Sequence, residues 1–85
     1  MTQATPSGRY WATVKFGALV DDNAVIGYDG LMETYFFQSG LENKQTGAPL
    51  HWFGRTHREF MSYHSLEQHM NSCGIIVLEW QLGSN

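Results

Sequence analysis

Residues 51–64, HWFGRTHREFMSYH, hold most of the residue types in this chain that could carry chemistry. They include three of the four histidines and two of the three arginines, set among four aromatic rings. Imidazole can bind a metal or transfer a proton near neutral pH, and a guanidinium group binds anions through paired donors. The segment could therefore form a metal site, an acid–base or anion-binding site, or an ordinary folded surface.

The spacing of the histidines argues against a metal site. Structural zinc takes about four Cys or His ligands, usually as close pairs. On one strand His51 and His57 would lie about 20 Å apart, and five helical residues turn His64 and His69 about 140° away from each other. Only His69 and Cys73, four residues apart, could share an ion. We therefore expect neither a metal nor another cofactor.

Residues 50–57 are predicted to form a strand, with Gly54 as a possible bulge. Strict alternation would place two imidazoles, a ring and a guanidinium group in one row, namely His51, Phe53, Arg55 and His57. Trp52 and Arg58 would fall on the other face. Such a row could hold a flat, anionic ligand, but arginine and aromatic residues also concentrate at protein interfaces. We predict that His51, Phe53, Arg55, His57 and Arg58 contact a partner or a ligand.

Catalytic motifs are missing from the sequence. The chain has neither a nucleophile elbow of the G-x-S-x-G type nor a glycine-rich phosphate loop. Cys73 falls at the C-terminal end of a predicted helix, where the helix dipole does not activate a thiol. Acid–base chemistry on His51, Arg55 and His57 stays open as an alternative. We favour a protein without catalysis of its own.

The size and charge of the chain restrict its possible partners. Its 85 residues allow one domain with one modest core, and the single cysteine cannot form an internal disulfide. Oligomerisation is a common way to stabilise so small a core. The formal net charge is −3, with five Lys and Arg against eight Asp and Glu. Nucleic-acid binding normally needs a basic surplus, so we do not expect a nucleic-acid partner.

The sequence predicts a cytoplasmic protein. No segment approaches the roughly 18 consecutive apolar residues of a membrane span. The start, MTQATPSG, lacks the basic-then-apolar order of a signal peptide. A single cysteine also suits a reducing compartment. We therefore expect no contact with a membrane.

The N-terminal half predicts strands. Residues 1–8 are small and polar and form a flexible tail, which leaves one domain over residues 9–83. The alternation in 9–19 predicts a strand, and 31–38, LMETYFFQ, reads as another. Asp and Asn at 21–23 and Asp29-Gly30 predict turns. Residues 24–30 could be a short returning strand or irregular, and a helix starting at Asp21 or Asp22 is the competing possibility.

The C-terminal half predicts one helix and a last strand. Residues 39–49 form a polar loop, and the helix covers about 63–73. Ser62 or Ser65 can cap its start, and Gly74 can end it. Its apolar stripe comprises Tyr63, Leu66, Met70 and Cys73. The strand 75–82 has Ile76, Leu78, Trp80 and Leu82 on one face.

These elements predict an α+β domain with a mostly antiparallel, curved sheet of four or five strands. One helix can cover only one face of such a sheet. The first strand nevertheless has Trp11 opposite its other apolar residues, and the third has Tyr35 and Phe37 on one side and Phe36 on the other. The rings on the uncovered face must therefore close into a barrel, meet another copy, or hold a ligand.

We favour another copy, because symmetric dimers are the commonest oligomers. The predicted self-interface comprises Trp11, Tyr35, Phe37 and Trp52. The chain would then be a small binding protein whose partner is itself and possibly another protein. The alternative is a small-molecule site on His51, Arg55 and His57. The small size and missing catalytic motifs would also suit an accessory protein of a mobile element or phage.

Overall fold

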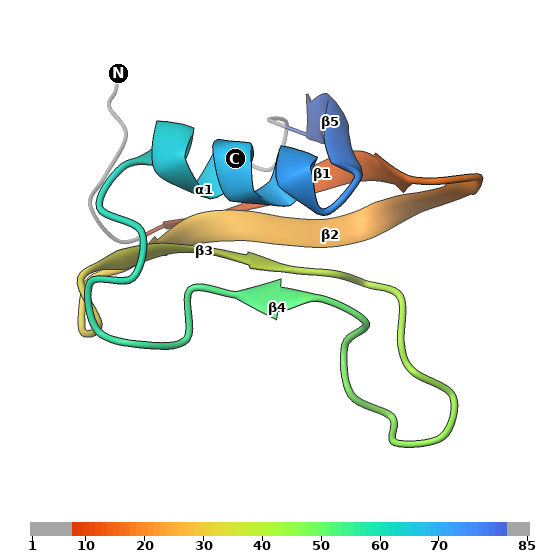
Figure 1. The fold of residues 1–85 in the computed structure, drawn as a ribbon, viewed down its shortest axis with the longest axis horizontal. Helices are drawn as coiled ribbons and strands as arrows, with labels where there is room; N and C mark the ends of the chain where they lie inside the picture. The colour runs from red at the N-terminus through yellow and green to blue at the C-terminus, as the bar shows by residue number, and fades with distance from the viewer. Residues whose placement is uncertain (1–7, 82–85) are drawn as a thin grey trace.

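The computed structural model describes residues 8–81 and confirms the predicted α+β class. Its strands form one open antiparallel sheet in the order β4-β3-β2-β1-β5, and the helix lies across one face (Figure 1). The elements are β1 (Gly8–Phe16), β2 (Leu19–Asp29), β3 (Thr34–Gln38), β4 (Trp52–Phe53), α1 (Tyr63–Ser72) and β5 (Ile75–Gln81). Most of the predicted tail and the end of the predicted domain, residues 1–7 and 82–85, lie outside the described residues.

The first chain reversal lies at Gly17, not at 21–23 as the sequence predicted. Gly17 has φ +61°, a conformation that favours glycine, and the hairpin brings Phe16 opposite Leu19. Residues 21–23 lie inside β2, where the register moves from Ala12 opposite Ala24 to Val14 opposite Asp21. The polar run therefore forms a bulge in a long strand.

The carboxylate of Asp21 explains why a turn-like sequence forms a bulge. Its Oδ1 accepts the Asn23 N–H at 3.0 Å, and its Oδ2 accepts the Gly40 N–H at 2.8 Å. Asp21 is buried, so these two donors replace the water that the carboxylate loses on folding. The same local chemistry that favours a turn here joins β2 to the start of the loop after β3.

The predicted turn at Asp29-Gly30 is confirmed. The Oδ1 atom of Asp29 accepts the N–H groups of Leu31 and Met32 at 3.0 and 3.1 Å. The turn continues through Glu33, which has φ +56°, so β3 begins at Thr34 and not at residue 31.

The helix forms as predicted, with Ser62 as its N-cap. The Ser62 hydroxyl accepts the N–H of Ser65 at 3.1 Å, and Gly74 follows the helix with φ +84°. Leu66 and Met70 are buried against the sheet, as the apolar stripe required. Within residues 8–81, no helix is long and apolar enough to cross a membrane.

The core lies between α1 and the sheet. β5 reaches it with Ile75 and Val77, whereas Ile76 is exposed. The register then shifts, because Val14 pairs with Val77 and Thr13 with Glu79, which leaves Leu78 as an extra residue. After this bulge Trp80 faces the helix, and its ring centroid lies 5.6 Å from that of Tyr63. The predicted single face of Ile76, Leu78 and Trp80 is therefore wrong.

Candidate functional site

The face of the sheet opposite α1, which we call the open face, is the candidate functional surface. Ala12, Ala24 and Phe37 point into the core, so their neighbours along each strand point the other way. One cross-strand row on the open face contains Trp11, Val25, Gln38 and Trp52. The next contains Arg9, Gly27 and Phe36.

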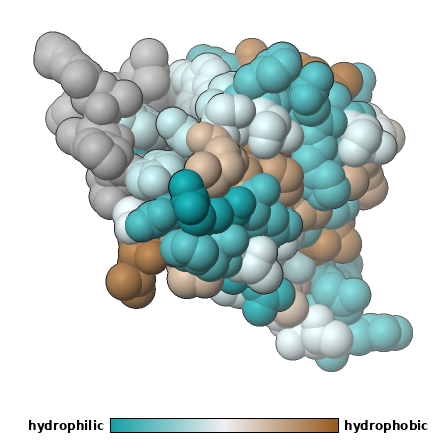
Figure 2. All heavy atoms as spheres, turned by 60° about the vertical axis from the view of Figure 1, so that its left-hand side comes forward, coloured by the Kyte–Doolittle hydropathy of each residue, from teal (hydrophilic) through white to brown (hydrophobic). Residues whose placement is uncertain are grey.

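A hollow of about 620 Å³ lies at one end of the open face. It is lined by the start of β1, the turn 30–32, Phe36, Trp52 and the segment 54–55. Figure 2 brings this end of the molecule forward and shows apolar side chains in separate groups among polar ones. The hollow therefore offers a ligand apolar walls and polar groups together.

Two glycines provide the room that the Phe36 side chain occupies. A Cβ atom on Gly27 would meet the Gly8 carbonyl oxygen and lie 2.9 Å from Cε1 of Phe36. A Cβ on Gly54 would meet the Tyr35 carbonyl oxygen and lie 2.7 Å from the Phe36 Cα. The Phe36 ring consequently lies against Gly27 and is only 8% exposed although it is on the open face.

Two arginines lie over aromatic rings of the hollow. The Cζ atom of Arg9 is 5.6 Å from the centroid of Phe36, and that of Arg55 is 4.4 Å from the Trp52 ring. A guanidinium group that contacts a ring through its flat face keeps the N–H groups at its edge available. Within residues 8–81, no ion pair involves Arg9 or Arg55. Both can therefore donate to an anion.

The predicted row of His51, Phe53, Arg55 and His57 does not form. His51 and Phe53 lie on the covered side, where the His51 ring is 4.6 Å from Phe16 and 5.8 Å from Phe53. Arg55 lies beside Trp52 on the open face. The cause is Gly54, whose φ of +82° ends the alternation after a strand of only two residues.

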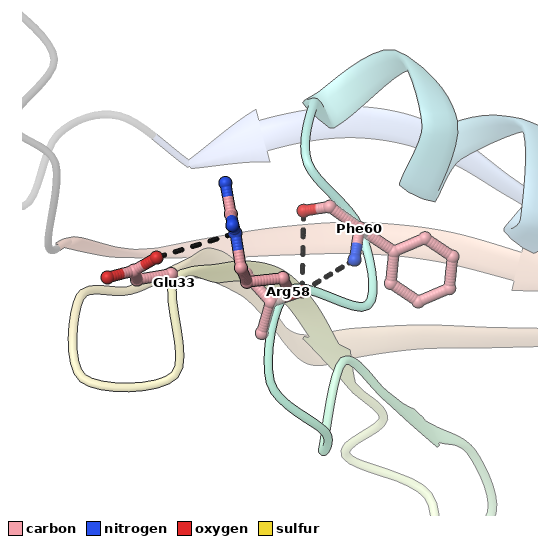
Figure 3. A network of polar contacts seen from close by, with 4 residues as sticks. Glu33, Arg58 and Phe60 are labelled. Atoms are coloured by element: carbon pink, nitrogen blue, oxygen red, sulfur yellow. Dashed lines mark hydrogen bonds and ion pairs between the residues drawn. The ribbon is translucent and has the colours of Figure 1, made fainter.

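His57 and Arg58 are exposed in the loop after β4. Figure 3 shows Arg58 reaching from this loop toward Glu33 on the β2–β3 turn. Its Nε atom is 3.5 Å from Oε1 of Glu33, and its backbone N–H donates to the Met32 carbonyl at 2.9 Å. Arg58 therefore ties the loop to the turn and lies outside the hollow.

One buried and two exposed hydrogen bonds reinforce this junction. The Thr34 hydroxyl oxygen accepts the Phe60 N–H at 2.7 Å, and Phe60 is the residue through which the loop enters the core (Figure 3). Oε1 of Glu59 accepts the N–H groups of Arg55 and Thr56 at 3.0 and 3.3 Å. These contacts hold Arg55 in place at the edge of the hollow.

The four predicted anchors of the self-interface divide between the two faces. Phe37 is 1% exposed in the core, and Tyr35 packs against the core from the covered side. Neither can contribute to an interface on the open face. Trp11 and Trp52 are on that face, 49% and 43% exposed. Phe36, which is not among the predicted anchors, lies on the same face.

His69 and Cys73 lie together beside the covered face. His69 Nε2 is 3.9 Å from Cys73 Sγ, and the His69 ring contacts Phe53 and Phe60. Residues 8–81 bring no group of three or more His, Cys, Asp or Glu side chains together. The Cys73 thiol and the His69 ring form a hydrogen-bonding pair at the end of α1.

The burial of His51 predicts a pH dependence of stability. Desolvation lowers the pKa of His51 in the folded protein below its usual 6.5. At pH values between the His51 pKa of the folded state and that of the unfolded state, the unfolded chain therefore binds more protons than the folded chain. The free energy of unfolding should therefore fall as the pH drops below about 6.5. We expect His51→Gln to remove part of this fall, measured by urea denaturation between about pH 7 and 5. Equal slopes in both proteins would contradict the prediction.

Known proteins give no indication of what binds the open face. Comparisons of the chain with protein-family models, curated proteins and solved structures found no match. A proposal for function must therefore come from the geometry described above.

Proposed function

We propose that this chain is a binding protein that forms a homodimer through its open face. The observation that carries the proposal is the row beside the β1–β2 hairpin, where Val20 and Ile76 flank Lys15 from opposite sides. Their side chains are 58% and 54% exposed, and Trp11 lies on the same face. Apolar side chains gathered on one uncovered face mark interaction sites in soluble proteins.

The size of the face supports a partner as large as a second copy. The five strands together contain 34 residues, and about 3.3 Å per residue with about 4.8 Å between strands gives a face of roughly 500 Å². Standard interfaces bury about 800 Å² of accessible surface on each partner, which is of the same order. A two-fold axis would place equivalent surfaces against each other, so Trp11 could pack near its counterpart in the second copy.

The polarity of the face suits a dimer that can also dissociate. Lys15 lies between Val20 and Ile76, and Arg9 follows Trp11 toward the other end of β1. Interfaces of this kind combine apolar anchors with a polar rim, and tryptophan is enriched among the residues that carry most of the binding energy. We therefore assign the central anchor to Trp11, with Val20 and Ile76 beside it.

The proposal keeps two further predictions from the sequence. The single cysteine supports a cytoplasmic location. The small size suits an accessory protein of a mobile element or phage that binds a larger machine. The accessory role would place the activity of the chain in binding a protein and not in catalysis.

Sedimentation velocity over a range of protein concentrations tests the dimer. We expect a dimer for the wild type and at least about tenfold weaker association for Trp11→Glu and for Ile76→Glu, because each replaces an apolar anchor with a carboxylate that the interface would desolvate. Met61→Glu is the matched control, since Met61 is exposed outside the open face. It should leave the dimer unchanged.

Two results would overturn this proposal. One is a wild-type protein that stays monomeric at the highest concentration reached. The other is a dimer that survives both Trp11→Glu and Ile76→Glu. Thermal unfolding of each variant shows whether it still folds, so a loss of association can be separated from a loss of structure.

A further inference from the structure

We infer that the hollow at the other end of the open face is a binding site for a flat aromatic monocarboxylate. The inference goes beyond self-association and does not depend on it. Arg9 lies in the hollow, whereas Lys15 marks the row proposed for the dimer. Six residues of a strand separate the two by about 20 Å. Trp11, the proposed anchor of the dimer, lies between them and only two residues from Arg9, so the ligand site borders the dimer contact.

The shape of the hollow fits a small, flat molecule. Its volume of about 620 Å³ falls within the range of about 300–1,000 Å³ for ligand pockets. Phe36 forms the floor, where Gly27 and Gly54 leave out side chains on both sides of it. Trp52 and Met32 add apolar surface from β4 and from the β2–β3 turn. Because Phe36 is only 8% exposed and lies under Arg9, an aromatic ring would contact mainly Trp52 and Met32.

The charge of the hollow fits a single negative charge. Arg9 and Arg55 bring two guanidinium groups, and Asp29 brings one carboxylate. One oxygen of Asp29 already accepts two backbone N–H groups, and these hydrogen bonds stabilise the β2–β3 turn. The hollow is left with one net positive charge, which a carboxylate would neutralise and a doubly charged phosphate would exceed. Guanidinium groups bind carboxylates through paired hydrogen bonds.

The arginine at the rim is held in position before any ligand binds. The Arg55 side chain lies over the Trp52 ring, and its backbone N–H is held by Glu59. A group that is already ordered loses less freedom on binding, which favours affinity.

Isothermal titration calorimetry with 2-naphthoate tests the inference. This probe has a flat fused ring and one carboxylate, and we expect the wild type to bind it with a Kd of about 0.1 mM. Naphthalene-2-carboxamide has the same shape without the charge. It should bind at least about tenfold more weakly, because it cannot form charged hydrogen bonds with the arginines.

Charge-removing variants locate the site. Arg9→Gln and Arg55→Gln should each weaken 2-naphthoate binding by about tenfold. Arg58→Gln is the matched control, because Arg58 is an exposed arginine of the same loop but lies outside the hollow. It should change the Kd by less than about twofold, since its ion pair is on the surface.

Three outcomes would overturn the inference: no binding of 2-naphthoate, equally tight binding of the carboxamide, or an equal loss in Arg58→Gln. The two proposals can also fail separately. If Ile76→Glu is monomeric but binds 2-naphthoate normally, both stand. If the wild type is a monomer that binds the probe, the dimer fails and the ligand site stands. If the wild type is a dimer that does not bind 2-naphthoate, only the ligand-site inference is wrong.

Discussion

Replacing Phe37 with alanine is expected to lower the free energy of unfolding by about 3–5 kcal/mol. Phe37 is among the largest fully buried side chains, and its ring centroid lies 5.9 Å from that of Phe53. The substitution would remove this ring contact between β3 and β4 and leave a cavity under α1. A domain of this size has a total stability of only about 4–13 kcal/mol, so the loss could unfold much of the protein.

Urea denaturation followed by circular dichroism measures this loss. Phe37→Leu is the milder companion, which keeps most of the volume and should cost about 1–2 kcal/mol. Trp11→Ala is the control on the opposite face of the sheet. Because Trp11 is half-exposed, its removal should change the stability of the monomer by less than about 1 kcal/mol. A larger loss for Trp11→Ala than for Phe37→Ala would reverse our assignment of the two faces.

Gly54→Ala is expected to cost about 2–5 kcal/mol, the second large effect. Gly54 has φ +82°, which an L side chain rarely adopts. Its new Cβ would also meet the Tyr35 carbonyl oxygen on the neighbouring strand. Both effects destabilise the short pairing between β3 and β4. The segment should therefore shift, and Arg55 and Trp52 should leave their places beside the hollow.

Gly47→Ala is a close control for this variant. Gly47 also has a positive φ, +75°, but a Cβ there would have nothing within 4 Å. Its cost should be limited to the backbone conformation, about 1–2 kcal/mol. The difference between the two variants, measured by urea denaturation, isolates the close approach of β4 to β3. Equal costs would mean that this approach contributes nothing to stability.

Most of the local structure could be predicted from the sequence. Alternation along β1, the Asp29 turn, and the helix between Ser62 and Gly74 depend on residues close together in the chain. Their physical causes act within one or two turns of backbone: side-chain period, a carboxylate that accepts nearby N–H groups, and a glycine with positive φ. Such causes are present in the sequence itself.

The faces of β3 could not be predicted in this way. Residues 34–38 carry rings on both sides of the strand. The alternation was therefore clear, but the sequence did not show which side faces the core. A shift of one residue would exchange Phe36 and Phe37 between core and surface. The choice was made by pairing, since Phe37 lies opposite Ile26 and Phe53, both on the side that α1 covers.

The hollow depended entirely on the tertiary structure. Arg9 and Arg55 are 46 residues apart in the chain, and only the sheet order β4-β3-β2-β1 places them on one face around Phe36. The sequence singled out Arg55 and Trp52 but put Arg55 in a row with two histidines. Gly54 interrupts that row, because it has a positive φ at the point where its backbone closely approaches β3. Composition and spacing determined which residue types this protein offers to a partner, whereas strand pairing decided which of them meet.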